Sequence, residues 1–136
     1  MTKKEEATGA TAPERSVFPP HRVLVVDDNR DAADSEAWLL RLCGQTVQTA
    51  YDGPSALRMA AAFNPEIVFV DLIMPGLDGL AVARQLREMP NMRGARIVAL
   101  TGYRNAVLRE AAELMGFDGH ILKPASTIDF TEFLTD

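Results

Sequence analysis

The chain has 136 residues, of which 47% are hydrophobic, and a net charge of −5 with a pI of about 5.0. That length supports one ordinary hydrophobic core, so we expect a single domain with a short tail and no separate output domain. The acidic balance argues against direct binding of nucleic acid, which needs clustered Lys and Arg.

The N-terminal segment, residues 1–20, is rich in charged and small residues and ends in two prolines. It lacks the apolar centre of a signal peptide, and no stretch of the chain approaches the ~20 apolar residues of a membrane-spanning helix. Cys43 is the single cysteine and lies in an apolar pattern, so we expect a small buried side chain rather than a nucleophile. These features predict a cytoplasmic protein without membrane contact, with a mobile tail over residues 1–20, in which only Val17 and Phe18 could dock, and one domain over residues 21–136.

From Arg22 onward, short runs rich in β-branched residues or Leu alternate with stretches of helical period. The predicted strands are residues 22–28, 46–50, 66–71, 95–101 and 119–122. The predicted helices are residues 32–43, 54–64, a segment around 80–86, 105–115 and a short segment that Ser126 or Thr127 caps. Their apolar faces are predicted to hold Ala33, Ala37 and Leu40; Leu57, Ala60 and Ala61; Leu80, Ala83 and Leu86; Val107, Ala111, Leu114 and Met115; and Ile128, Phe130, Phe133 and Leu134.

Alternating units of this kind, joined by right-handed crossovers, form a doubly wound α/β fold with helices on both faces of a parallel sheet. We expect five parallel strands in the flavodoxin-like order 2-1-3-4-5, in which the first and third strands are neighbours. Ligands of such folds bind in the crevice beyond the carboxyl ends of the strands.

Polar residues follow four of the five predicted strands. They are Asp27 and Asp28 after the first, Asp71 after the third, Thr101 after the fourth and Lys123 after the fifth. If the first and third strands are neighbours, three carboxylates share one rim and repel each other. Either some of them stay protonated, or a hard divalent cation lies among them, and such a ligand set suits Mg²⁺.

The stretches "VDDN", "VDLIMPGLDG", "ALTG" and "LKP" resemble the receiver domain of two-component response regulators, and the resemblance runs from about Arg22 to the end of the chain. It is specific because each stretch lies at its own predicted strand end.

The resemblance implies that Asp71 accepts a phosphoryl group from a phosphohistidine of a histidine kinase or a histidine phosphotransfer protein. It implies that Mg²⁺ is held by Asp28, by Asp27 partly through water, by Asp71 and by the backbone carbonyl of Ile73. Thr101 and Lys123 would stabilise the phosphoryl oxygens. Movement of Thr101 would then rearrange the face formed by the fourth helix and fifth strand, where an unknown downstream protein binds.

On this reading the chain is a stand-alone response regulator that catalyses only its own phosphorylation and dephosphorylation and turns over no external substrate. It would be a monomer, or a dimer promoted by phosphorylation. The alternative is a receiver-shaped adaptor that binds a partner without phosphorylation, and the sequence leaves both open.

Two positions depart from the receiver pattern or modulate it. Receivers commonly carry Tyr or Phe three residues before the Lys, and His120 stands there instead. His120 could act as the switch or could be an ordinary half-exposed histidine. Ile73 and Tyr103 lie two residues beyond Asp71 and Thr101, where bulky side chains restrict the water that hydrolyses the phosphoryl group; ordinary packing is the other reading.

The same residues also allow simpler roles, and two other protein classes share parts of the pattern. Asp27, Asn29 and Asp31 could cap the first helix, and Lys123 could be a surface charge. A haloacid dehalogenase type of phosphatase needs a second Asp two residues after the nucleophile as general acid, and Ile73 cannot serve. A flavin binder needs a phosphate cradle after the first strand, where the acidic "DDNRDA" would repel phosphate.

Overall fold

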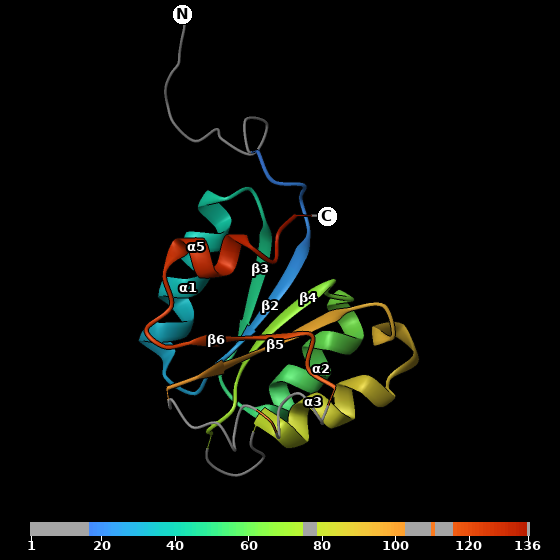
Figure 1. The fold of residues 1–136 in the computed structure, drawn as a ribbon. Helices are drawn as coiled ribbons and strands as arrows, with labels where there is room; N and C mark the ends of the chain where they lie inside the picture. The colour runs from blue at the N-terminus through green and yellow to red at the C-terminus, as the bar shows by residue number, and fades with distance from the viewer. Residues whose placement is uncertain (1–16, 75–78, 103–109, 111–115, 136) are drawn as a thin grey trace, which may run out of the picture.

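The protein forms one parallel sheet flanked by helices (Figure 1). The computed structural model describes residues 17–74, 79–102, 110 and 116–135. The sheet has five strands in the order β3-β2-β4-β5-β6. Their bounds are β2 (Arg22–Val26), β3 (Thr46–Ala50), β4 (Ile67–Asp71), β5 (Arg96–Thr101) and β6 (Gly119–Leu122). Every pairing is parallel, so the predicted order 2-1-3-4-5 is confirmed.

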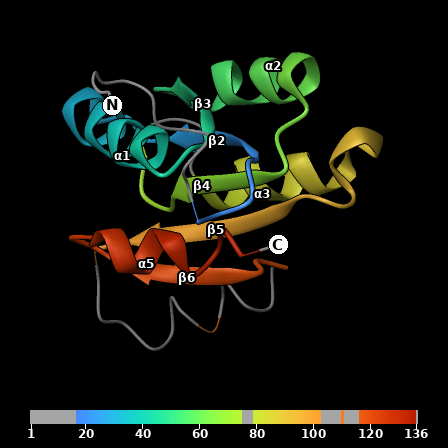
Figure 2. The same ribbon diagram turned by 90° about the horizontal axis from the view of Figure 1, so that it is seen from above.

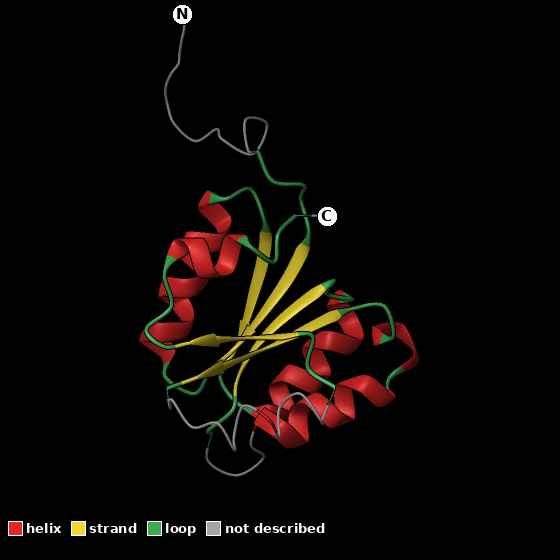
Figure 3. Ribbon diagram, in the orientation of Figure 1, coloured by secondary structure: helices red, strands yellow, loops and turns green. Residues whose placement is uncertain are grey.

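The helices form two layers, one on each face of the sheet (Figures 2 and 3). Their bounds are α1 (Arg30–Leu42), α2 (Gly53–Phe63), α3 (Gly79–Glu88), the 3₁₀ helix η2 (Pro90–Met92) and α5 (Thr127–Thr131). Helices α1 and α5 cover one face, and α2 and α3 cover the other (Figure 2). The predicted helix over residues 105–115 lies outside the described residues, except for Glu110, which is helical.

The central strand β4 carries no polar residue before its last position, because both of its faces are covered. All five of its residues are buried, and the last of them is Asp71. Its side chains alternate between the two core layers: Val68 and Val70 pack with α2 and α3, while Ile67 and Phe69 pack with α1 and α5. Continuous hydrophobicity is what a parallel strand covered on both faces requires.

Local signals in the sequence account for the helix ends. Asn29 caps α1, because its side chain accepts a hydrogen bond from the Ala32 amide at 3.1 Å. Asp52 caps α2, with a proline in the first turn, and Asn64 ends that helix in the left-handed conformation. Ser126 forms a capping box with Asp129 at the start of α5. Of the three caps proposed for the first helix, Asn29 is confirmed.

Several boundaries and faces differ from the prediction. The first strand ends at Val26, so Asp27 and Asp28 lie beyond it rather than in it. In α2 the buried stripe runs through Ala56 and Ala60, and Ala61 is exposed because it is turned about 100° away from its neighbour. The side chain of Ile128, predicted to face the core, is 70% exposed.

Three smaller corrections concern side chains near helix ends. Cys43 is half-buried rather than buried. On α3, Val82 is fully buried and Leu80 only partly, because Leu80 lies at the helix start. The loop predicted after α3 contains η2, whose Met92 is buried in the core.

The described chain begins at Val17, and its first residues contact the segment just after α1. Phe18 packs against the core layer of α1 and α5. Gln45, itself buried, accepts a hydrogen bond from the His21 amide at 2.8 Å and donates one to the Pro19 carbonyl at 3.0 Å. This segment is thereby tied to the domain. Among the described residues, no helix is long and apolar enough to span a membrane.

Candidate functional site

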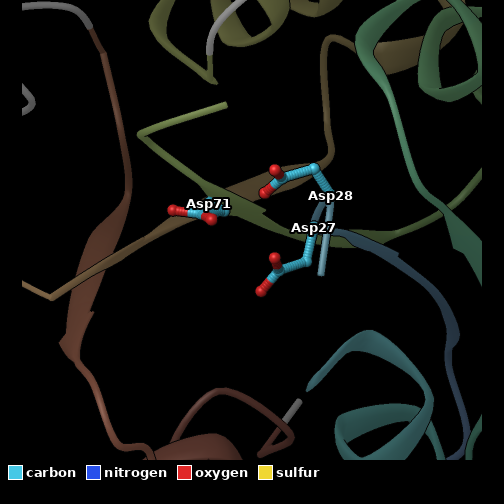
Figure 4. Close-up of side chains that lie close together, drawn as sticks. All are labelled: Asp27, Asp28 and Asp71. Atoms are coloured by element: carbon cyan, nitrogen blue, oxygen red, sulfur yellow. The ribbon is translucent and has the colours of Figure 1, made fainter. Parts of the chain in front are cut away.

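Three carboxylates meet at the carboxyl edge of the sheet. Asp27 and Asp28 follow β2, and Asp71 is the last residue of β4, the strand paired with β2. One oxygen from each of the three lies within 4.8 Å of the others. Figure 4 shows the three side chains gathered there. The structure therefore confirms the prediction that adjacent strands bring the three carboxylates to one edge of the sheet.

The three carboxylates differ in burial. Asp27 is fully buried, Asp71 is 7% exposed, and Asp28 is exposed. Backbone amides two residues further along hold the buried pair: Asn29 N–H donates to Asp27 Oδ1 at 3.0 Å, and Ile73 N–H donates to Asp71 Oδ1 at 3.1 Å. Each of these bonds fixes one carboxylate oxygen and leaves the other facing the site.

Lys123 bridges the two buried carboxylates. Its Nζ lies 2.8 Å from Asp27 Oδ2 and 3.3 Å from Asp71 Oδ2. Lys123 follows β6, and its amide donates to the Thr101 carbonyl at 2.7 Å, which aligns the ends of β5 and β6. The simpler reading of Lys123 as a surface charge is therefore wrong, because its ammonium is the counter-ion of the site.

The charges at this edge are only partly balanced. Burial raises the pKa of Asp71, and the charge of Asp27 adds to the shift, against the hydrogen bond from Ile73 and the charge of Lys123. For Lys123, burial acts to lower the pKa, but the hydrogen bond to Asp27 and the charges of Asp27 and Asp71 outweigh it and raise the pKa. One ammonium thus contacts two of the three carboxylates, and the described residues of the site carry more negative than positive charge.

This donor set fits a hard divalent cation. All three side chains offer oxygen, and two of them are already oriented by backbone hydrogen bonds. A cation there would oppose the burial effect that raises the pKa of Asp71, since an adjacent positive charge favours the carboxylate. Asp27, Asp28 and Asp71 could therefore hold a metal ion.

The start of α3 packs directly against the backbone of Asp71. The Gly79 amide donates to the Leu72 carbonyl at 3.2 Å. A Cβ placed on Gly79 would lie 2.0 Å from the Asp71 carbonyl oxygen and 2.6 Å from the Leu72 Cα. Glycine is required here for the close approach of the two backbones.

The remaining predicted residues occupy different surroundings. Thr101 is buried at the end of β5, on the same edge as the carboxylates. The Ile73 side chain is 52% exposed beside Asp71. His120 lies in β6, paired with Ala99, and is exposed. Tyr103 lies outside the described residues. Of the named side chains, the structure joins Asp27, Asp28, Asp71 and Lys123 directly.

Sequence reasoning missed Glu36, in α1. Its side chain is half-buried, and its Oε1 is buried without a hydrogen-bond partner among the described residues. The signal was available: Glu36 lies three residues after Ala33 and one before Ala37, both fully buried, so helical spacing places it at the edge of the buried face.

Comparison with known proteins agrees with the fold. The family model described as the response regulator receiver domain matches residues 23–135. The response regulator MprA of Mycobacterium ulcerans is 40% identical over 103 residues, 76% of this chain and 44% of that protein. The transcriptional regulatory protein PrrA of Mycobacterium tuberculosis is 38% identical over 117 residues, 86% of this chain and 46% of that protein.

Solved structures show the same architecture. The chemotaxis protein CheY4 of Vibrio cholerae superimposes with a TM-score of 0.80 at 24% identity, covering 85% of this chain and 97% of that one. A response regulator structure from Chloroflexus aurantiacus gives 0.79 at 26% identity over 85% and 94% of the two chains. The present chain spans less than half the length of the curated relatives named above. By its sequence over residues 23–135 and by its sheet order, the chain belongs to the response regulator receiver domain family.

Proposed function

We propose that the chain accepts a phosphoryl group on Asp71 from a phosphohistidine of a histidine kinase or a histidine phosphotransfer protein. The observation that carries the proposal is the setting of Asp71: a nearly buried carboxylate at the end of the central strand, 3.3 Å from the Lys123 ammonium and beside Asp27 and Asp28. A nucleophile must be held rigidly if its oxygen is to attack phosphorus in line with the bond that breaks.

In the transfer, an Asp71 carboxylate oxygen forms a bond to phosphorus while the phosphorus–nitrogen bond of the donor breaks. The imidazole leaves with the electron pair. The negative charge on the equatorial phosphoryl oxygens needs fixed positive partners, and Lys123 and the Thr101 hydroxyl are proposed to supply them. Lys123 is already placed beside Asp71 at 3.3 Å, which supports this role.

We propose Mg²⁺ as the cofactor, held by Asp27, Asp28, Asp71 and the backbone carbonyl of Ile73. When bound, it neutralises charge between the carboxylates and the phosphoryl oxygens. Asp27 and Asp71 are pre-oriented for this by the amides of Asn29 and Ile73, and the exposed Asp28 keeps the site open to solvent.

The signal is proposed to be a shift of population between two packings. Thr101 follows the phosphoryl group and changes the surface around β6, with His120 in the position of the aromatic switch residue of other receivers. His120 is exposed on β6, where a partner can contact it. Ile73 and Tyr103 are proposed to slow hydrolysis by limiting access of water.

The cellular context is likewise a proposal. We infer a cytoplasmic protein, monomeric or dimeric on phosphorylation, that acts on a downstream protein and turns over no substrate apart from its phosphodonor. Because the chain spans less than half of its curated relatives, their activities are not transferred to it.

The test is incubation with Mg²⁺ and acetyl phosphate, followed by intact mass, beside an Asp71→Asn variant. We expect one added phosphoryl group on the wild type and none on the variant. Phosphorylation of both would show that Asp71 is not the acceptor. No phosphorylation of either, by acetyl phosphate or by phosphohistidine proteins, would favour an adaptor that works without phosphorylation.

A further inference from the structure

Glu36 is a buried acidic side chain that the proposed phosphoryl transfer does not use. It lies in α1, on the edge of the helix face that carries the fully buried Ala33 and Ala37. Its Oε1 is buried and has no hydrogen-bond partner among the residues that the structure describes. Burying a carboxylate without a partner is costly, so an unsatisfied carboxylate oxygen in this place calls for a reason.

The charges that act on Glu36 belong to the acidic site. The pKa of Glu36 is raised to about 7: burial is the largest cause, the charges of Asp27 and Asp71 add to the shift, and the charge of Lys123 opposes it. These groups come from the ends of β2, β6 and β4, so Glu36 lies within electrostatic reach of the site from the α1 side.

Other charged groups nearby are turned away or already engaged. On α1 itself, Arg30, Asp31, Asp34 and Arg41 are exposed. On α5, which covers the same face of the sheet, the Asp129 carboxylate accepts a hydrogen bond from the Ser126 amide at 2.8 Å. Among the described residues, Glu36 makes no hydrogen bond to Asp27, Asp71 or Lys123, so it belongs to the field of the site and not to its ligand set.

A divalent cation at the site would shift the protonation equilibrium of the Glu36 carboxyl group. Without one, Glu36 faces two like charges and one ammonium. With two positive charges added among Asp27, Asp28 and Asp71, the charged form of Glu36 is favoured, and by linkage charged Glu36 favours the cation. An uncoordinated carboxylate whose interaction with the ion is worth half to one pKa unit changes cation affinity by roughly three- to tenfold.

We propose that Glu36 strengthens binding of the divalent cation without coordinating the ion: its carboxylate is carried by α1, the helix that follows Asp27 and Asp28, and its Oε1 is buried without a hydrogen-bond partner among the described residues. This inference rests on the proposed function, because it concerns the cation of the same site. The proposed cation ligands lie at strand ends, whereas Glu36 lies on a helix and would act on the cation from there.

The experiment is isothermal titration of the whole chain with Mg²⁺ or Mn²⁺ at pH 6 and pH 8. It uses the wild type, Glu36→Gln and the matched control Glu88→Gln, which makes the same change at an exposed position at the end of α3. At pH 8 we expect Glu36→Gln to bind the cation roughly three- to tenfold more weakly than the wild type. The difference should shrink at pH 6, and Glu88→Gln should follow the wild type.

Two further measurements separate charge from packing. Titration in buffers of different ionisation enthalpy should show more protons released per cation by the wild type than by Glu36→Gln at pH 7. A second variant, Glu36→Met, removes the charge with an apolar side chain of similar length and should match Glu36→Gln in affinity.

Three outcomes would overturn the inference. Equal affinity and equal proton release in the wild type and Glu36→Gln would show that Glu36 does not act on the cation. Loss of affinity in only one of the two neutral variants would assign the effect to packing. A wild type that binds no divalent cation would refute both this inference and the proposed cofactor, whereas normal binding with an unchanged Glu36→Gln would refute this inference alone.

Discussion

At the residue scale, the molecule keeps more negative than positive charge at one edge. Lys123 holds both Asp27 and Asp71, at 2.8 and 3.3 Å, while Asp28 and Glu36 have no ammonium partner among the described residues. Such an excess costs folding free energy, because buried like charges repel and lose hydration. A bound cation would reduce this repulsion. The same excess of negative charge therefore destabilises the fold and favours binding of a cation.

Glu36 should make folding stability depend on pH. Its pKa is about 7 in the fold against 4.5 ordinarily, so the folded state binds more protons between these values. The contribution of protonated Glu36 to the free energy of unfolding is therefore fully present below pH 4.5 and is lost as pH rises through 7. We expect Glu36→Gln to match the wild type at pH 5 and to exceed it at pH 8 by about 1–3 kcal/mol, a range that allows for the partial exposure of the side chain.

Urea unfolding of both proteins at pH 5 and pH 8, without divalent cation, measures this difference. A constant offset between the two proteins at both pH values would assign the change to packing. A wild type more stable than Glu36→Gln at pH 8 would contradict the prediction outright.

At the element scale, the contact between the start of α3 and the end of β4 holds the backbone of Asp71 in place. Gly79 brings the two backbones together, and its amide bonds to the Leu72 carbonyl at 3.2 Å. The strand is held firmly because both of its faces are packed. The position of the Asp71 carboxylate thus depends on a residue eight positions further along the chain.

Gly79→Ala should damage both stability and the site. The new Cβ would lie 2.0 Å from the Asp71 carbonyl oxygen, a backbone atom that cannot rotate away. We expect a loss of at least about 3 kcal/mol, the upper part of the range for overpacking, and weaker cation binding in whatever fraction folds. Chemical unfolding and Mg²⁺ titration measure the two effects.

Gly94→Ala is the matched control, because a Cβ there meets no described atom within 4 Å. It should change stability by less than about 0.5 kcal/mol, as surface substitutions do. Equal effects of the two substitutions would show that the close approach at Gly79 is not a constraint.

At the scale of the whole molecule, the parallel sheet gathers residues that are far apart in the chain. Lys123 and Asp27 are separated by 96 positions and lie in hydrogen-bond contact. The site exists only when β2, β4 and β6 are all in place, so any ligand of the site stabilises the entire fold.

Mg²⁺ should therefore raise the unfolding temperature. At ten times its dissociation constant the gain is about 1.4 kcal/mol, which corresponds to an increase of about 4–6 °C for a domain of this size. Asp28→Asn should lose most of this gain, since it removes an exposed ligand, and should be slightly more stable than the wild type without Mg²⁺ because one repulsive charge is gone.

Thermal unfolding with Mg²⁺ and with EDTA checks this prediction, with Asp31→Asn as the control for an exposed carboxylate of α1. The control should gain as much as the wild type. Equal gains in the wild type and Asp28→Asn would show a general salt effect instead of a site.

Much of the architecture was readable from local patterns. The five strands and the caps at Asn29 and Ser126 follow from hydrophobic period and from side chains that compete for backbone amides. The sheet order was expected from the flavodoxin-like type of fold, and the structure has it. The errors fell where period alone is ambiguous: Ala61 and Ile128 carry apolar side chains on the outer side of short helices. Whether such a residue faces the core depends on how the helix is rotated against the sheet.

By itself, the sequence determined which residues end the strands, and hence that Asp27, Asp28, Asp71, Thr101 and Lys123 share one edge. In a parallel sheet the carboxyl ends of all strands lie at the same edge, so residues at these ends come together there. Only the tertiary structure decided that Lys123 contacts both buried carboxylates, that Gly79 abuts the backbone of Asp71, and that one oxygen of Glu36 is buried without a partner among the described residues. These contacts depend on how far each helix and loop is shifted and turned over the sheet. Packing in three dimensions sets those shifts, and no spacing in the sequence encodes them directly.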